Sequence, residues 1–271
     1  MGQTLAAIAE WRRSAPRLAD EVAAEWGLAL GAAYPPGVEG HVVRAECGDG
    51  TPAVLKLAWP NWESEHAADA LRLWDGDGAV RLLARDDERH ALLLERCEPG
   101  TALSQAAPDP LGELIELLPR LWKSGDGFRT VAEEADRWFA GDLAQVADRR
   151  LRDAATRILH ELVPTQGELV LVHQDLHAEN VLAAQRQPWL TIDPKPLAAE
   201  RELSAAPIVR STELGHSRRD VIYRLDRLCA DLDLDRERAR GWTIAHTVAW
   251  LGGSDPVATH VDTAHWLLDE A

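Results

Sequence analysis

Two short stretches decide the fold of this chain: LVLVHQDLHAENVL at residues 169–182 and WLTIDPK at residues 189–195. Each begins as a short apolar run, a pattern typical of a buried strand, and each run ends in polar side chains. The polar side chains that follow can hold a proton or a metal ion; they are His173, Asp175, His177, Glu179, Asn180 and Asp193. Their position at the ends of two strands predicts a functional site.

Three chemistries can use such side chains. A metal hydrolase would use the alternating His173, Asp175 and His177, because imidazole and carboxylate are good zinc ligands, but no second His and Asp cluster completes the site. Nucleophilic hydrolysis needs a Ser or Cys nucleophile in a motif such as G-x-S-x-G, which the chain lacks. Phosphoryl transfer fits best, because His173, Asp175 and Asn180 have the H-x-D-x4-N spacing of a kinase catalytic loop.

The chemistry of phosphoryl transfer explains this spacing. A carboxylate at Asp175 can orient a substrate hydroxyl and accept its proton. Mg²⁺ prefers oxygen ligands, which the amide of Asn180 and the carboxylate of Asp193 can supply against nucleotide phosphates. Lys56 lies in the apolar run AVLKLAW and is one of three lysines among 29 basic residues. Because arginine cannot imitate its compact ammonium, Lys56 is expected to reach the nucleotide phosphates.

The chain is expected to form two domains, at residues 1–97 and 98–271, separated near the Pro-Gly pair of EPGT. The first is predicted to be a small sheet with one helix, preceded by a helical stretch, and the second to be mainly helical. Expected strands are at residues 41–47, 52–59, 79–86, 90–97, 169–172, 181–182 and 189–192. Expected helices are at residues 3–30, 67–74, 111–123, 130–148, 149–162, 218–233, 235–251 and 256–269.

The composition is that of an ordinary globular protein, with 46% hydrophobic and 27% charged residues. No apolar run approaches the ~20 residues that span a bilayer, and the N-terminus lacks the pattern of a signal peptide. Cys47, Cys97 and Cys229 have no metal-binding spacing and are expected to be free thiols in the cytoplasm. The net charge of −16 argues against nucleic acid as a partner. It favours a cationic small substrate or serves solubility alone.

The segments VHQDLHAENVL and LTIDPKPL resemble the aminoglycoside phosphotransferase family, and most closely its streptomycin 6-phosphotransferase and hydroxyurea phosphotransferase branch. TPAVLKLAWP, ALLLERCEPGT and DRLCADLDLDRERARGW are also similar to that branch. The resemblance implies an α+β, two-lobed protein-kinase-like fold with ATP and Mg²⁺ as cofactors. It also implies an enzyme that phosphorylates a hydroxyl of a small, often cationic molecule, such as a streptomycin-type antibiotic, and so confers resistance. A monomer or a weak homodimer is expected.

By matching motif, the resemblance makes Asp175 the catalytic base and His173 a support of the catalytic loop. It makes Asn180 and Asp193 the Mg²⁺ ligands and Lys56 the phosphate anchor. The segment LLLERCEPG would be the hinge against which adenine lies, bonded mainly through backbone groups near Glu95 and Cys97. In the family, a Glu on the helix of the first lobe pairs with the Lys. Ala67 holds that position here, so Glu63 or Glu65 is expected to substitute.

Three further positions depart from the family pattern. Gln174 replaces the usual Gly after the catalytic-loop His, and Ser204 stands where an Asp that supports the loop is expected. The glycine-rich loop is short, with Gly37 and Gly40 only. These departures leave a second interpretation open, a kinase-like protein that binds nucleotide or ligand with little or no turnover.

Overall fold

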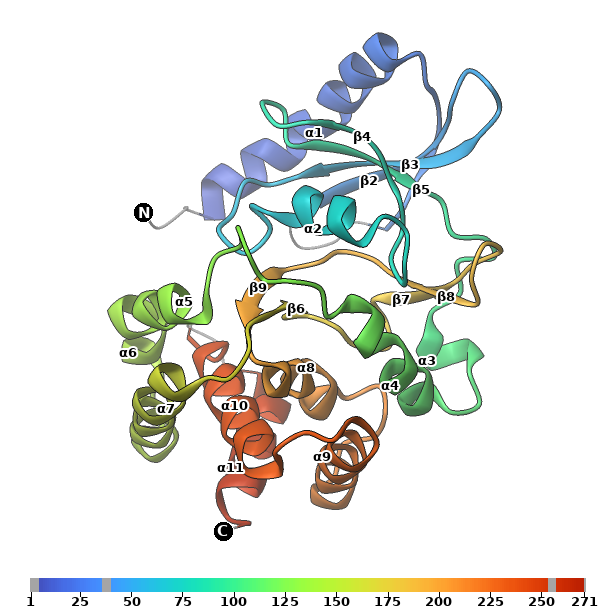
Figure 1. Ribbon diagram of the computed structural model, residues 1–271. Helices are drawn as coiled ribbons and strands as arrows, with labels where there is room; N and C mark the ends of the chain where they lie inside the picture. The colour runs from blue at the N-terminus through green and yellow to red at the C-terminus, as the bar shows by residue number, and fades with distance from the viewer. Residues whose placement is uncertain (1–4, 36–39, 253–256, 271) are drawn as a thin grey trace.

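The computed structural model describes residues 5–35, 40–252 and 257–270. An antiparallel sheet carries a long helix on its outer face, and a mainly helical part lies on the other side of the sheet (Figure 1). The five strands of this sheet follow the order β1-β2-β3-β5-β4. The elements of this first part are α1 (Leu5–Trp26), β1 (Ala29–Ala33), β2 (Gly40–Glu46), β3 (Pro52–Ala58), α2 (Ala67–Trp74), β4 (Leu82–Asp86) and β5 (Ala91–Glu95).

The expected hairpins of the sheet are confirmed. β2 pairs with β3 and β4 pairs with β5, both antiparallel. In the expected glycine-rich loop, Gly37 lies outside the described residues, whereas Gly40 begins β2. β3 lies at the centre of the sheet between β2 and β5.

The packing of α1 on the sheet determines which way Lys56 points. Ala15, Ala19 and Val22 form one stripe of α1 and are buried against Leu55 and Leu57 of β3. Because side chains alternate along a strand, Lys56, between these two leucines, lies on the opposite face of the sheet. That face is directed toward the helical part.

The helical stretch expected to reach residue 30 ends earlier. α1 stops at Trp26, and Gly27 follows with a φ of +65°. A left-handed residue at this point is a common helix end, because glycine adopts it without steric penalty. The expectation is therefore wrong for Ala29 and Leu30, which pair with β2 as part of β1. Pairing with a neighbouring strand overrides the helical preference of Ala and Leu there.

The second part is built from helices around two short two-stranded sheets. The expected helices at 218–233, 235–251 and 256–269 correspond to α9 (Arg218–Leu232), α10 (Arg236–Ala249) and α11 (Ala258–Leu268), and position 256 lies outside the described residues. The helix expected at 130–148 is divided by a π-helical turn at Trp138–Asp142. The helices are α3 (Leu103–Ala106), α4 (Pro110–Leu121), α5 (Val131–Arg137), α6 (Leu143–Gln145), α7 (Arg149–Leu162), α8 (Ala205–Arg210), α9 (Arg218–Leu232), α10 (Arg236–Ala249) and α11 (Ala258–Leu268).

Four strands hold the catalytic segment. They are β6 (Val170–His173), β7 (Val181–Ala183), β8 (Trp189–Thr191) and β9 (Pro196–Ala199). β6 pairs with β9, and β7 pairs with β8. β9 and α8 were not expected, because short apolar runs such as PLAA and AAPIVR carry no clear period. Every residue of both elements is buried, so tertiary packing fixes their conformation.

The large core of the helical part extends to α2. Leu71 and Trp74 of α2 are buried in it, and the Trp74 indole N–H donates to the Leu121 carbonyl at 2.9 Å. α2 therefore connects the sheet to the helical part, and the division at residue 97 stays a prediction. In the part of the chain that the structure describes, no helix has the length and apolar character needed to cross a membrane.

Candidate active site

Lys56 and Asp193 meet where the sheet faces the helical part. The Lys56 ammonium donates a hydrogen bond to the Asp193 carboxylate, and the two residues also form an ion pair. Burial disfavours ionisation of Asp193, but the attraction and hydrogen bond of Lys56 outweigh it and lower the pKa of this carboxyl. The phosphate anchor and one metal ligand expected from the sequence are thus in direct contact.

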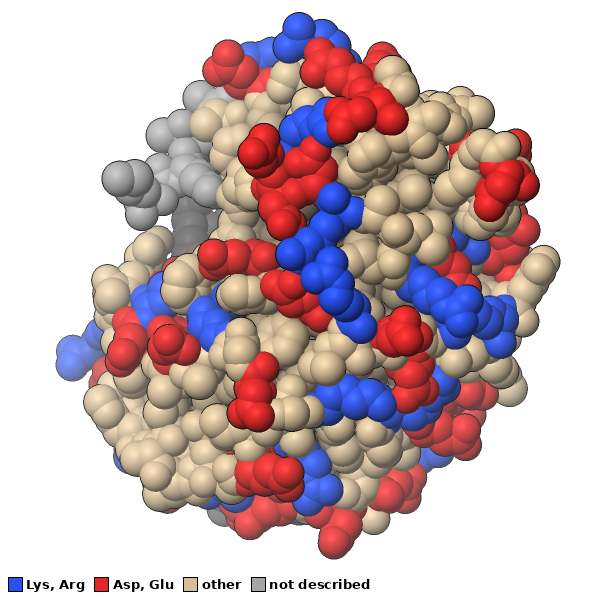
Figure 2. Space-filling view, turned by 45° about the horizontal axis from the view of Figure 1, so that its top comes forward, with Lys and Arg blue, Asp and Glu red and all other residues tan. Residues whose placement is uncertain are grey.

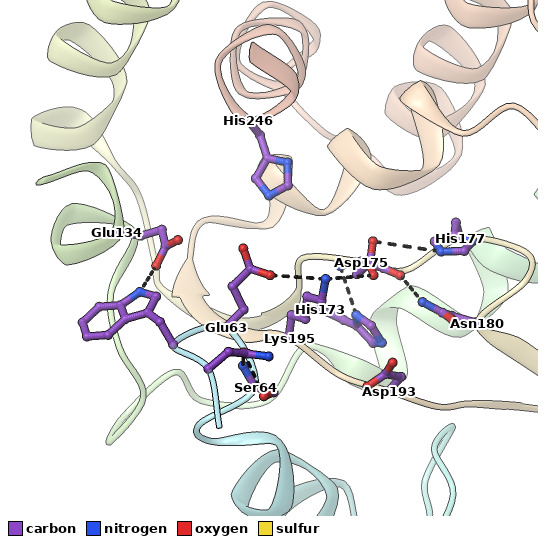
Figure 3. Close-up of polar contacts among 12 residues, drawn as sticks. Glu63, Ser64, Glu134, His173, Asp175, His177, Asn180, Asp193, Lys195 and His246 are labelled. Atoms are coloured by element: carbon purple, nitrogen blue, oxygen red, sulfur yellow. Dashed lines mark hydrogen bonds and ion pairs between the residues drawn. The ribbon is translucent and has the colours of Figure 1, made fainter. Parts of the chain in front are cut away.

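The β7–β8 hairpin brings Asn180 next to Asp193. The Ile192 N–H donates to the Asn180 carbonyl at 2.9 Å, so Asn180 lies opposite the residue that precedes Asp193. The Asn180 side-chain amide donates to the backbone carbonyl of Asp175 at 2.9 Å, a contact drawn in Figure 3. This bond fixes the amide and leaves its oxygen for another partner. Asp193 itself has a φ of +53°, an uncommon conformation for a residue with a side chain.

Asp175 lies between two cations. Its Oδ2 is 3.4 Å from the Lys195 ammonium, and its Oδ1 is 3.6 Å from the Arg210 guanidinium. Burial opposes ionisation of Asp175, but Lys195 and Arg210, with smaller contributions from two histidines, lower the pKa of its carboxyl. The carboxylate is therefore charged at neutral pH and able to accept a hydrogen bond from a hydroxyl.

His173 holds the catalytic loop together and is not available to a metal ion. Its Nε2 contacts the Ile192 carbonyl at 3.0 Å, and its Nδ1 accepts from the Asp175 N–H at 3.2 Å. These two bonds require a neutral ring with the proton on Nε2, in agreement with the burial that lowers the His173 pKa. Because both ring nitrogens are used, the metal-hydrolase interpretation loses its first ligand. Among the described residues no group of three His, Cys, Asp or Glu could hold a metal ion.

Neither Glu63 nor Glu65 pairs with Lys56. Both precede α2 instead of lying on it, and Lys56 contacts Asp193. The Glu63 carboxylate is 3.2 Å from the Lys195 ammonium, as Figure 3 shows, and Glu65 is exposed at the edge of a surface pocket. The expectation that either glutamate replaces the helix Glu is therefore wrong. The loop before α2 places the Glu63 carboxylate next to Lys195, which lies in the catalytic segment.

The expected hinge follows β5. The Glu95 carboxylate is occupied by Arg186, which donates from Nε and Nη2 at 2.8 Å each, so this side chain is not available to adenine. Sheet pairing ends at Glu95, and Cys97 is buried beyond it. The backbone groups at Cys97 therefore lie beyond the strand pairing, and the expected bond from this segment to adenine stays a prediction.

Three residues that the sequence did not indicate lie together beside Asp175: Arg210 contacts its carboxylate, and His246 and Trp250 contact Arg210. Arg210 ends α8, and His246 and Trp250 lie at the end of α10. The Arg210 Nη1 is 2.8 Å from His246 Nδ1, and its guanidinium lies 4.0 Å from the Trp250 ring centre. Burial cannot be read from the sequence, so no local signal identified these residues. Ser204, in the place of the expected Asp, accepts a hydrogen bond from the Trp122 indole N–H at 3.0 Å.

Acidic and basic side chains are interleaved over the described residues of the surface in Figure 2. Many of them are paired: Asp69 with Arg85 at 2.6 Å and Arg227 with Asp109 at 2.7 Å are examples. The net charge of −16 is therefore spread over the surface and does not by itself mark a binding site.

Comparison with known proteins identifies the family. Residues 26–252 match the family described as aminoglycoside/hydroxyurea antibiotic resistance kinase. The chain is 39% identical over 251 residues to streptomycin 6-kinase of Streptomyces griseus, covering 87% of this chain and 81% of that protein. It is 37% identical over 256 residues to hydroxyurea phosphotransferase of Kitasatospora aureofaciens, covering 90% and 74% of the two chains.

Solved structures agree on the fold. Choline kinase LicA from Streptococcus pneumoniae superposes with a TM-score of 0.68 at 13% identity, covering 94% of this chain and 97% of that one. Aminoglycoside phosphotransferase APH(4)-Ia superposes with a TM-score of 0.62 at 15% identity, covering 94% and 96%. The two-lobed kinase-like fold expected from the sequence is confirmed. The chain therefore belongs to the aminoglycoside/hydroxyurea antibiotic resistance kinases and is a phosphotransferase.

Proposed function

We propose that this protein transfers the γ-phosphoryl group of ATP to a hydroxyl of a streptomycin-type aminoglycoside or a related hydroxylated molecule. The observation that carries the proposal is the convergence of Lys56, Asn180 and Asp193 beside Asp175. An ammonium, two oxygen donors and a charged carboxylate are the groups that phosphoryl transfer needs. The similarity to streptomycin 6-kinase supports the choice of acceptor.

Asn180 and Asp193 are the proposed ligands of Mg²⁺, and they fit a hard cation. The Asn180 amide nitrogen is already bonded, which directs its oxygen to another partner, and Asp193 is ionised beside Lys56. Oxygen donors of this kind are the ligands that Mg²⁺ prefers. When bound, the ion would neutralise charge on the phosphates. The Lys56 ammonium would then turn partly from the Asp193 carboxylate to donate hydrogen bonds to phosphate oxygens.

Asp175 is the proposed catalytic base. In its ionised form it orients the acceptor hydroxyl and accepts its proton as the new oxygen–phosphorus bond forms, while the bond from the γ-phosphorus to the bridging oxygen breaks and ADP leaves. Lys195, 3.4 Å from Asp175 and 3.2 Å from Glu63, is well placed to turn toward the transferred phosphoryl group. The backbone near Cys97 would bond adenine. The free thiols of Cys47, Cys97 and Cys229 support a cytoplasmic location for the enzyme.

A cationic acceptor is proposed because carboxylates flank the base. Glu63 lies on one side of Lys195, and Glu213 accepts from the Ala178 N–H at 2.9 Å beneath the catalytic loop. Burial opposes ionisation of Glu213, but its bonds to His177 and Ala178 lower the pKa of its carboxyl. Glu213 is therefore charged at neutral pH, and its carboxylate and that of Glu63 can attract a guanidinium or ammonium group of the acceptor.

Two substitutions separate the proposed roles. Purified protein is incubated with Mg-ATP and streptomycin or hydroxyurea, and the acceptor is followed by mass spectrometry. Asp175→Asn should lower kcat by about 10²–10⁴-fold and leave the Kd for Mg-ATP nearly unchanged. Asp193→Asn should weaken Mg-ATP binding itself. Asp153→Asn, an exposed acid on α7, is the matched control and should change neither.

The outcomes distinguish an enzyme from a binding protein. Normal Mg-ATP binding without phosphorylation of any acceptor would favour the second interpretation, a kinase-like protein without turnover. Full activity of Asp175→Asn would remove Asp175 from the role of base. An unchanged Kd in Asp193→Asn would remove Asp193 from the metal site.

A further inference from the structure

Arg210 is a buried arginine whose guanidinium faces the catalytic carboxylate. It is 4% exposed at the end of α8, and its Nη2 is 3.6 Å from Asp175 Oδ1. On its other side, its Nη1 is 2.8 Å from His246 Nδ1. Its guanidinium also lies over the Trp250 ring, 4.0 Å from the ring centre.

His246 can hold Arg210 only as a neutral acceptor. It is fully buried, and burial, with Arg210, lowers its pKa well below the ordinary value. Burial lowers the pKa of Arg210 to about 10, opposed by the attraction of Asp175 and Glu63, so the guanidinium stays charged at neutral pH. The charged guanidinium of Arg210 therefore donates to the neutral Nδ1 of His246. This bond fixes the position of the guanidinium on the side opposite its contact with Asp175.

The two cations beside Asp175 differ in what fixes them. The partners of Lys195 include Asp175, Glu63 and the Trp250 ring, and its long flexible chain can exchange such contacts. Arg210 is buried, is bonded to His246 and has a planar, rigid head. Lys195 contacts Oδ2 of the carboxylate and Arg210 contacts Oδ1, so each oxygen has its own cation.

We propose that Arg210, held by His246 and Trp250, is a positioning residue that fixes the carboxylate of Asp175 while Lys195 is engaged with phosphate. This inference rests on the proposed function, because it assumes that Asp175 receives the acceptor proton. Ser204, which stands where the resemblance leads us to expect a loop-supporting Asp, has its hydroxyl bonded to Trp122. In this chain, support of Asp175 comes from the end of α8 instead.

Arg224 provides a matched control. It is 1% exposed on α9, and its donors go to backbone carbonyls of Val209, Ser211, Leu214 and Gly215. It therefore holds the chain around α8 and makes no ion pair with Asp175. A substitution at Arg224 reports the effect of losing a buried arginine without the contact to the base.

The test measures three quantities: kcat for streptomycin phosphorylation, the rate of ATP hydrolysis without acceptor, and the Kd for Mg-ATP. Arg210→Met should lower kcat by on the order of 10–100-fold, because small displacements of a reacting group have effects of this size. The Kd and the acceptor-free hydrolysis should change far less. Arg224→Met should lower transfer and hydrolysis together, through loss of folded protein.

His246 variants keep the test decisive if Arg210→Met does not fold. His246→Asn places an amide oxygen near the position of Nδ1 and should retain most of the transfer activity. His246→Leu removes the acceptor and should reproduce the loss of kcat relative to hydrolysis.

An equal ratio of transfer to hydrolysis in Arg210→Met and Arg224→Met, or equal activity of His246→Asn and His246→Leu, would overturn the inference. A higher KM for streptomycin at unchanged kcat would also overturn it, since Arg210 would then bind the acceptor. Absence of transfer by the unmodified protein would instead count against the proposed function.

Discussion

Glu134 is predicted to join the loop before α2 to the helical part of the molecule. Its carboxylate is fully buried on α5 and accepts from the Trp62 indole N–H at 2.6 Å, from Arg129 Nε at 2.8 Å and from Arg137 Nη2 at 3.0 Å. Arg129 also donates to the Trp62 carbonyl at 2.8 Å. These contacts, visible in part in Figure 3, hold the loop that carries Glu63 to the catalytic segment.

Glu134→Gln should lower the free energy of unfolding by about 3–5 kcal/mol. The side chain keeps its shape, but the Arg129 guanidinium, 5% exposed, loses its counter-charge, and loss of one partner of a buried ion pair has an effect of this size. A typical domain has only about 5–15 kcal/mol of stability, so the change is readily measured by urea denaturation. The same variant should also bind a cationic acceptor more weakly, because Glu63 loses its fixed position.

Glu133→Gln is the matched control for this prediction. Glu133 is the preceding residue, is exposed, and closes a capping box with Thr130 at the start of α5. Glutamine serves in a capping box as well as glutamate, so its effect should lie within about 0.5 kcal/mol. Equal unfolding free energies for Glu134→Gln and Glu133→Gln would refute the assignment of Glu134 as the buried counter-ion of Arg129.

Three further results are expected. Lys56→Met should raise the Kd for Mg-ATP by about 10–100-fold, the worth of a hydrogen bond to a charged group, as isothermal titration can measure. Burial, with Arg210, lowers the pKa of His260 to about 4, so the unfolded chain binds more protons between that pH and 6.5. The free energy of unfolding should fall as the pH drops through this window, and less so in His260→Gln. Burial raises the pKa of the Cys97 thiol to about 12, so Cys97 should react slowly with iodoacetamide at pH 8. The half-buried Cys47 should be labelled first, which peptide mass spectrometry can show.

The chemical groups of the site could be predicted, but part of their pairing could not. The alternation of β3 places Lys56 opposite the core leucines, and the order of His173, Asp175 and Asn180 is local. These features follow from periods of two residues and from short spacings. The partner of Lys56 was assigned to Glu63 or Glu65, whereas the contact is with Asp193, 137 residues away. A contact between residues so far apart in the sequence depends on how the sheet packs on the helical part.

Arg210, which contacts Asp175, and His246 and Trp250, which contact Arg210, were missed for a related reason. Arg210 stands in the short apolar segment AAPIVR, and His246 and Trp250 belong to a helix with no unusual pattern. Nothing local distinguishes Arg210 from Arg224, which is equally buried and bonds only backbone carbonyls. Their different surroundings arise from the packing of α8 against α10 and against the catalytic segment.

The sequence by itself determined which reactive groups the protein has, and where each lies on its strand or loop, because backbone geometry converts short spacings into directions. Only the tertiary structure decided which groups touch: that Lys56 meets Asp193, that Glu63 turns to Lys195, and that Arg210 lies behind Asp175. The physical reason is that each of these pairs joins separate segments, and charges attract any opposite partner that packing brings within reach.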